Sequence, residues 1–439
     1  MRIKKHFGRR KKRVGCLLAI LMCAANLASQ RVPSKPSFRL LHTFGISGST
    51  DYDGAFPPAQ SLTRGADGSI YGAVEGGGGT ACGGYGCGMI YRLSAKGRQE
   101  WSAEILYKFR GSSDGAFPQG GIAEDPQGRL YGTTGGDGGA SPATTFRLTP
   151  EHDRPWEFAV IYNQGGPPPG LILDAEGDLY GPIGPGEYGA GAIAELTPSS
   201  GEYWNYNVLY SFHPDFQNGS DGEITYFGLT WDRRGNLYGT TYGGGNFMSC
   251  QLSGLGGDGC GTAFQLLPNP DGTWTENVLH RFDAYSGDGE IPYGPVTLDP
   301  AGNVYGTTIH GGAYQDGRVF KLTPTGIGSD AVWIETAIYD FPSCAEGCSP
   351  GDNMVMDAAG NLYGVAGGGN ACEGGYTCGV VFELSPQASG QWTYSVLHKF
   401  NGSDGFGPNG LALDGKGNLL GTTVYGGANN TGVIFEITP

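Results

Sequence analysis

Five aspartates, each followed directly by a glycine, are residues whose type and spacing could do chemistry in this chain. They are Asp53, Asp114, Asp221, Asp288 and Asp404. One interpretation is turn formation, because Asp hydrogen-bonds to its own backbone and Gly adopts a positive φ without strain. The alternative is a calcium site, but Ca²⁺ takes about 6 to 8 oxygen ligands and the chain has no Asp-x-Asp-x-Asp run. We therefore expect turns here and no cofactor, with calcium as the alternative.

Tyrosines within glycine-rich segments are a second set of candidates. Their rings could stack on a ligand such as a sugar, or pack as ordinary surface aromatics. They are Tyr85, Tyr188, Tyr242, Tyr314 and Tyr376. Because binding residues gather on loops that a rigid scaffold holds, we expect these tyrosines and the five aspartates to lie on one ligand face.

Three motifs that resemble enzyme sites are better explained as structure. Residues 111–115 fit the G-x-S-x-G pattern, but no helix follows them as a nucleophile elbow requires. Residues 76–79 lack the lysine of a phosphate-binding loop. His42, His280 and His398 occupy equivalent places in three different repeats, too far apart to share one metal. We therefore assign no catalytic residue and no metal ligand.

All these candidates belong to a repeated unit, which is the strongest signal in the sequence. A tryptophan is followed six positions later by tyrosine or histidine, with invariant spacing. The pairs are Trp101 with Tyr107, Trp156 with Tyr162, Trp204 with Tyr210, Trp274 with His280, Trp333 with Tyr339 and Trp392 with His398. A further copy ends in His42 and has Pro36 at the tryptophan position.

Each unit contains three more apolar runs. A short run ending in Asp precedes a Gly-Asn-Leu-Tyr-Gly run, and an aromatic-x-Leu-Thr-Pro run follows. Close copies of the middle run span residues 235–239, 302–306 and 360–364, and weaker copies centre on Tyr71, Tyr131, Tyr180 and Leu420. Gly, Asn and Asp between the runs supply turns, so each unit predicts four short strands.

These units predict an all-β fold, a single seven-bladed β-propeller of four-stranded antiparallel blades. Strands that are apolar on both faces must be buried between neighbours, which favours a ring over a solenoid or two packed sandwiches. Because the chain starts with a fourth strand, we expect an N-terminal strand to complete the C-terminal blade and remove the open edges. The expected blades are residues 59–110, 120–163, 169–212, 227–282, 294–341, 353–400 and 409–439 plus 38–44.

The unit at residues 396–439 carries a family resemblance. It reads Val-Leu-His-Lys-Phe, Gly-Ser-Asp-Gly, Gly-Leu-Ala-Leu-Asp, Gly-Asn-Leu, Gly-Thr-Thr, Gly-Gly and Val-Ile-Phe-Glu-Ile-Thr-Pro. This text resembles the exported choice-of-anchor tandem repeat proteins built of GloVer repeats. The resemblance implies an exported bacterial protein, often surface-associated, without an established molecular activity. Such proteins frequently end in an anchoring tail, whereas this sequence stops within a repeat at Pro439, so we expect free secretion.

The first 29 residues have the layout of a signal peptide. A basic head at residues 2–13 precedes an apolar run at residues 14–28, which is shorter than the roughly 20 residues that span a bilayer. Cleavage is the expectation, and an uncleaved anchor is the alternative. Eight later cysteines form near-neighbour pairs, which predict disulfides in an oxidising compartment. The pairs are Cys82 with Cys87, Cys250 with Cys260, Cys344 with Cys348, and Cys372 with Cys378.

The net charge of the chain limits the classes of molecule that it can bind. Beyond residue 29 the chain holds 19 of its 27 basic residues and all 42 acidic ones, for a net charge of −23. Nucleic acid is therefore not an expected partner, because its binding needs clustered Lys and Arg. We expect a secreted, cell-surface or periplasmic binding protein for an unknown ligand, with a polysaccharide or other cell-surface component as candidates. The alternative is a secreted carbohydrate-active hydrolase or lyase that uses carboxylates of the loop face.

Overall fold

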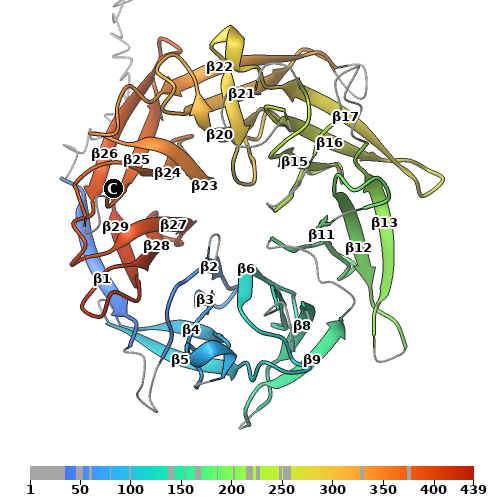
Figure 1. Ribbon diagram of the computed structural model, residues 1–439, viewed down its shortest axis with the longest axis vertical. Helices are drawn as coiled ribbons and strands as arrows, with labels where there is room; N and C mark the ends of the chain where they lie inside the picture. The colour runs from blue at the N-terminus through green and yellow to red at the C-terminus, as the bar shows by residue number, and fades with distance from the viewer. Residues whose placement is uncertain are drawn as a thin grey trace, which may run out of the picture. The chain divides into compact units, whose positions relative to one another are not determined.

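The repeated units form seven small antiparallel sheets in a computed structural model of the protein (Figure 1). The structure describes residues 35–45, 53–58, 62–79, 81–97, 100–136, 143–152, 154–163, 170–184, 186–200, 203–213, 221–223, 228–246, 250, 259–326, 331–372 and 377–439. The expected signal peptide at residues 1–29 lies outside these ranges. Within residues 36–439 the sheets are arranged radially, which confirms the all-β seven-bladed propeller.

The first four blades follow one another in the chain. The first contains β2 (Leu62–Arg64), β3 (Ile70–Val74), β4 (Met89–Lys96) and β5 (Glu100–Lys108). The second contains β6 (Pro118–Glu124), β7 (Leu130–Thr134), β8 (Thr144–Thr149) and β9 (Glu157–Tyr162). The third contains β10 (Ile172–Leu173), β11 (Leu179–Ile183), β12 (Ala192–Thr197) and β13 (Asn205–Ser211). The fourth contains β14 (Thr230–Trp231), β15 (Leu237–Thr241), β16 (Thr262–Pro268) and β17 (Trp274–Arg281).

Three more blades complete the ring. The fifth contains β18 (Gly289–Pro292), β19 (Thr297–Leu298), β20 (Val304–Gly311), β21 (Arg318–Pro324) and β22 (Trp333–Asp340). The sixth contains β23 (Cys348–Met356), β24 (Leu362–Gly367), β25 (Val380–Pro386) and β26 (Trp392–Lys399). The seventh contains β27 (Phe406–Leu413), β28 (Leu419–Tyr425), β29 (Val433–Thr438) and β1 (Ser37–Thr43). Two single-turn 3₁₀ helices, η1 (Cys82–Gly84) and η2 (Ala284–Ser286), lie in loops.

The first and last described strands meet in the seventh blade. Strand β1 pairs antiparallel with β29, from Ser37 opposite Thr438 to Thr43 opposite Val433. Figure 1 shows the blue β1 strand outermost beside the red β29 strand. The expected closure by an N-terminal strand is therefore confirmed, and pairing with β1 covers the edge that β29 would otherwise expose.

A phenylalanine after the outer strand joins each of six blades to the next. Its ring lies about 5 to 6 Å from an aromatic ring on the third strand of the following blade, within the range of favourable aromatic contacts. The pairs are Phe44 and Tyr91 (5.6 Å), Phe109 and Phe146 (5.3 Å), Phe212 and Phe264 (5.2 Å), Phe282 and Phe320 (5.0 Å), Phe341 and Phe382 (5.5 Å), and Phe400 and Phe435 (5.2 Å). In the sequence, Gln164 and Ala194 replace both rings at the remaining junction.

The same third-strand rings explain the last glycine of the Gly-Asn-Leu-Tyr-Gly run. A Cβ atom built on Gly306 would lie 2.4 Å from Cζ of Phe320, and one on Gly364 would lie 2.5 Å from Cζ of Phe382. The ring therefore lies directly over the neighbouring second strand, where a larger side chain has no room. This glycine is a packing requirement of the blade.

Replacing Gly306 with alanine is therefore expected to lower the free energy of unfolding by about 1 to 3 kcal/mol, the usual cost of overpacking a core. Urea denaturation of the wild type and the variant measures the difference. Gly184→Ala is the matched control, because a Cβ atom there meets no described atom within 4 Å. Equal midpoints for wild type and Gly306→Ala would contradict the packing argument.

The aspartate at the end of the inner-strand run builds the hairpin on the side opposite the Asp-Gly loops. Oδ1 of Asp299 accepts hydrogen bonds from the backbone N–H groups of Ala301 and Asn303, both at 2.9 Å. The Tyr305 hydroxyl donates to Oδ2 at 3.0 Å. Burial acts to raise the pKa of Asp299, but a hydrogen bond from the Asn303 side chain at 2.6 Å, together with the three above, outweighs it and lowers the pKa. The carboxylate therefore serves the turn itself.

Candidate functional site

Two kinds of connection share one side of the ring, which we call the loop face. Asp-Gly loops lead into the inner strands, and Gly-Gly loops join the second and third strands. The loops brace one another, since Ala55 and Gly76 form an antiparallel bridge and the N–H of Gly427 donates to the carbonyl of Gly402 at 2.9 Å. Backbone hydrogen bonds between the loops therefore hold the side chains of this face in place.

All four expected disulfides are present. They join Cys82 to Cys87, Cys250 to Cys260, Cys344 to Cys348 and Cys372 to Cys378. The disulfide between Cys344 and Cys348 joins the loop that leads into β23 to the first residue of that strand. The other three lie in connections between second and third strands. Each closes a short loop, so we expect it to stiffen its loop more than it stabilises the whole ring.

A proline four residues after four of the five aspartates extends the Asp-Gly motif, and sequence reasoning missed it. The residue before this proline has a positive φ, for example 60° at Ile291 and 66° at Gly407. Its N–H donates to the preceding blade, from Ile291 to the carbonyl of Cys260 at 2.9 Å and from Gly407 to that of Cys378 at 3.0 Å. Disulfides thus anchor carbonyl groups that link adjacent blades. The repeated Asp-Gly-x-x-Pro spacing was the signal that could have revealed this link.

The five aspartates of the Asp-Gly loops all bind within the protein. Each carboxylate accepts a hydrogen bond from, or pairs with, the tyrosine or histidine of the preceding outer strand, which lies six positions after a tryptophan in four cases and six positions after Pro36 in the case of His42. The distances are 2.9 Å for His42 and Asp53, 2.8 Å for Tyr107 and Asp114, 2.5 Å for Tyr210 and Asp221, 2.6 Å for His280 and Asp288, and 3.0 Å for His398 and Asp404.

Backbone groups occupy the aspartates as well. Asp404 accepts the N–H of Asn401 at 2.9 Å, and Asp221 accepts that of His213 at 2.9 Å. At Asp53 burial acts to raise the pKa, but the hydrogen bond and charge of His42 outweigh it and lower the pKa. These contacts favour the turn-forming role, and a role in ligand binding stays a prediction.

The four of the five candidate tyrosines that the structure describes lie in four different blades. Tyr85 in the first blade, Tyr188 in the third and Tyr314 in the fifth are 61%, 48% and 58% exposed, and each lies on a different loop. Tyr242 follows β15 in the fourth blade and is partly buried. Tyr376 lies outside the described residues. A ligand that touches several of these rings would have to span several blades.

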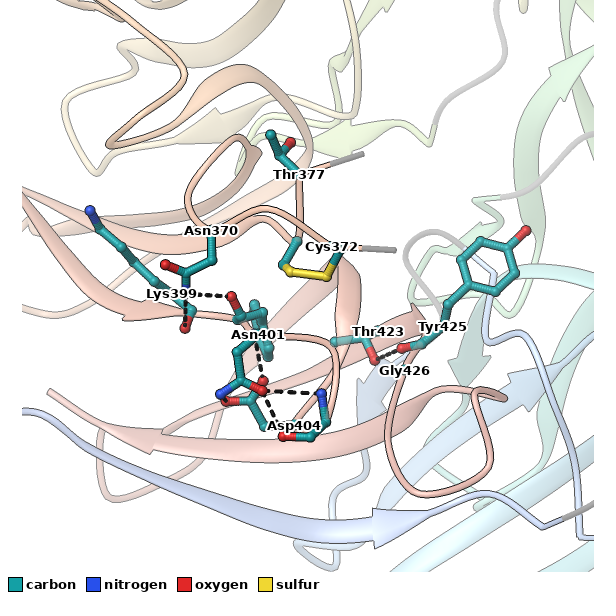
Figure 2. Close-up of a disulfide and its surroundings, with 12 residues drawn as sticks. Asn370, Cys372, Thr377, Lys399, Asn401, Asp404, Thr423, Tyr425 and Gly426 are labelled. Carbon is teal, nitrogen blue, oxygen red and sulfur yellow. Dashed lines mark hydrogen bonds between the residues drawn. A yellow bond between two sulfur atoms is a disulfide. The ribbon is translucent and has the colours of Figure 1, made fainter. Parts of the chain in front are cut away.

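A cleft of about 1080 Å³ lies where the sixth and seventh blades meet on the loop face. Its walls include Cys372 and Asn401 from the sixth blade and its following loop, and Phe406, Tyr425 and Asn430 from the seventh. Figure 2 shows Cys372 and Asn401 on neighbouring loops and Tyr425 at the end of strand β28. Tyr425 is 43% exposed and contacts Phe406 with ring centroids 5.7 Å apart. Sequence reasoning did not single out this residue.

Hydrogen bonds hold the polar groups of the cleft in place. Oδ1 of Asn401 accepts both the N–H of Ser403 at 3.1 Å and its hydroxyl at 2.7 Å. Oδ1 of Asn430 accepts the N–H of Gly426 at 2.9 Å. Because the side-chain oxygens serve the loops, the cleft has a defined shape before any ligand arrives.

A second hollow of about 350 Å³ lies among the inner-strand entries of the first, fifth, sixth and seventh blades. Glu75, Tyr293 and Asp352 are among its lining residues. Burial raises the pKa of Glu75 and that of Tyr293. In the described part of the chain, no group of three or more His, Cys, Asp or Glu residues is placed to hold a metal ion.

Fold and repeats together define a radial repeat protein with a braced loop face. The model of the Gloeobacter/Verrucomicrobia repeat matches residues 57–255 and 245–439, in two overlapping tandem copies. The chain belongs to this repeat family, as the resemblance in its last unit indicated. No curated protein matches the chain.

Three solved structures are similar to this chain at low sequence identity and with TM-scores below 0.5. A luciferin-regenerating enzyme is 14% identical with a TM-score of 0.44, covering 75% of this chain and 92% of its own. A putative glucose dehydrogenase from Thermus thermophilus is 14% identical with a TM-score of 0.43, covering 92% and 100%. PorZ, a surface component of the type-IX secretion system of Porphyromonas gingivalis, is 14% identical with a TM-score of 0.48, covering 88% and 47%.

Proposed function

We propose that this protein is an exported binding protein that takes a carbohydrate chain in the cleft between the sixth and seventh blades. The observation that carries the proposal is the exposed ring of Tyr425 beside amide and hydroxyl groups held by the loops. An aromatic ring offers an apolar face for the C–H side of a sugar, and a few fixed polar groups orient the ligand.

The composition of the cleft supports an uncharged sugar. Its described lining residues are Gly, Ala, Ser, Asn, Phe, Tyr and a disulfide-bonded Cys. Neutral amide and hydroxyl groups suit the hydroxyl groups of a neutral polysaccharide, which they can bind without desolvating a charge. The described volume of about 1080 Å³ is at the upper end of ordinary ligand pockets and leaves room for more than one sugar ring.

Export is part of the proposal. Disulfides persist in oxidising compartments, so four of them fit an extracellular protein. The basic and apolar layout of residues 1–29 supplies the export signal. Among the described residues, no helix has the length and apolar character needed to cross a bilayer.

Tyr425→Ala is expected to weaken binding of the best ligand from a glycan array by about tenfold, equivalent to about 1.4 kcal/mol of lost stacking. Titration calorimetry with that ligand measures the change. Tyr285→Ala is the control, because Tyr285 is 66% exposed in η2 on a loop of another blade. Equal losses for both variants, or none for Tyr425→Ala, would reject the cleft as the binding site.

A reducing-end assay on the same ligands separates binding from catalysis. Retention without product supports the binding function. Release of reducing ends would instead support the alternative of a carbohydrate-active hydrolase or lyase, which needs two carboxyl groups about 5 to 10 Å apart.

A further inference from the structure

Aromatic rings stack across four of the seven junctions between blades, and at one of the other three the ring is replaced by alanine. In these four cases the residue two positions after the tryptophan of an outer strand, or after Pro36 in β1, stacks on the tyrosine or histidine of the preceding blade. The stacked rings are nearly parallel. The pairs are Tyr107 and Phe158 (4.0 Å), Tyr162 and Tyr206 (5.0 Å), Tyr339 and Tyr394 (4.3 Å), and His398 and Phe38 (3.8 Å).

At the junction between the seventh and first blades, this position holds Ala103 and the facing residue is His42. A cavity of about 200 Å³ lies there, which we call the junction cavity. Its walls include His42, Phe44, Asp53, Ala103 and Ile105. The missing ring of the first blade accounts for the space over the imidazole.

Two other junctions indicate how well this position is shielded from water. Glu276 and Glu335 take the place of the ring there. Burial raises the pKa of both carboxyl groups, because it removes the water that would stabilise their charged forms. The junction cavity keeps an opening to solvent, since Ile105 on its wall is 36% exposed.

The junction between the fifth and sixth blades indicates what would fill the cavity. There Tyr394 stacks on Tyr339, and its hydroxyl donates to the carbonyl oxygen of Glu346 at 2.6 Å. Glu346 precedes Gly347 as Asp53 precedes Gly54 in the repeat. A phenol ring in the junction cavity would therefore stack on His42 and present its hydroxyl to the backbone of Asp53.

We propose that the junction cavity is a binding site for a single phenol ring, stacked on His42 and bounded by Phe44 and Ile105. The volume suffices, because apolar protein cavities of about 150 Å³ bind benzene. The imidazole and the Asp53 loop add a polar end that selects a hydroxyl-bearing ring over benzene. The site is separate from the carbohydrate cleft, which lies at the junction between the sixth and seventh blades.

The test is titration of the purified protein with p-cresol, followed by chemical shifts of the His42 ring in NMR spectra. Saturable shifts with p-cresol, and binding at least about threefold weaker for toluene, are the expected results. A short tyrosine peptide distinguishes the source of the ring. Tighter binding than p-cresol indicates a tyrosine of another polypeptide, and equal or weaker binding indicates a free phenol.

The variant Ala103→Phe is designed to remove the proposed site by filling it. The new ring should fill the cavity, raise Tm and abolish the p-cresol shifts. Ala337→Phe, on an exposed position of outer strand β22, should change neither. If Ala103→Phe does not fold, Ala103→Leu serves the same purpose. No saturable binding by the wild type, or unchanged binding by the filled variant, would overturn the proposal.

Discussion

The free energy of unfolding is expected to be at least about 5 kcal/mol lower for a chain that begins at residue 46 than for one that begins at residue 36. This difference is a large part of the stability of an ordinary domain. The shorter chain lacks β1 and therefore leaves β29 as an open edge. It also lacks Phe44, which is 1% exposed and packs on Tyr91 of the first blade. Loss of such a buried phenylalanine alone costs about 3 to 5 kcal/mol.

Urea denaturation of the two chains, followed by circular dichroism, measures this effect. A synthetic peptide of residues 36–45 should restore stability to the shorter chain in proportion to its concentration, because it binds only the folded ring. Coincident denaturation curves for the two chains, or no response to the peptide, would show that the ring does not depend on this closure.

Glu276→Gln is expected to remove a large part of the pH dependence of stability between about pH 4.5 and pH 8. Burial, and then repulsion from Asp221, raises the pKa of Glu276 from 4.5 to about 8 in the folded protein. Among the described residues, Oε1 of Glu276 has no hydrogen-bond partner. The folded state therefore keeps this proton across a pH range in which the unfolded chain has lost it.

The sign follows from proton linkage. The folded state binds more protons than the unfolded state in this window, so the contribution of Glu276 to stability is greatest below pH 4.5 and is lost as pH rises towards 8. Each pH unit accounts for up to about 1.4 kcal/mol, and partial access to water reduces the total to about 2 to 4 kcal/mol.

Denaturation midpoints at pH 5 and pH 8.5 measure the effect. The stability of the glutamine variant relative to the wild type should be higher at pH 8.5 than at pH 5, because the variant carries no ionisable group at this position. Glu157→Gln, at an exposed position of outer strand β9, is the control and should keep the wild-type pH slope. If the denaturation midpoints of Glu276→Gln and the wild type differed by the same amount at both pH values, the raised pKa of Glu276 would be refuted.

The blades themselves were predictable because the information for them is local. Each strand carries its own apolar run, and Gly, Asn and Asp between the runs specify the turns within a few residues. The disulfides were predictable for the same reason, since the paired cysteines are only 4 to 10 residues apart in the chain. Even ring closure followed from order along the chain, because an unpaired fourth strand at the start matches a missing fourth strand at the end.

The candidate sites depend on contacts that join different blades, and there the sequence alone decided less. The pattern of Asp-Gly loops left turn formation and ligand binding open, and the tertiary structure places Asp114 against Tyr107 of the preceding outer strand. The cleft at Tyr425 and the cavity at Ala103 arise where loops or strands of two blades meet.

The sequence by itself determined the number of repeats, the order of the strands within a blade and the pairing of cysteines. The tertiary structure decided which side chain of one blade faces which side chain of the next, and so where a ring, a carboxyl group or an empty space lies. The physical reason is that a strand pattern reports only whether a face is buried. The fit between two buried faces depends on the shapes of residues far apart in the chain.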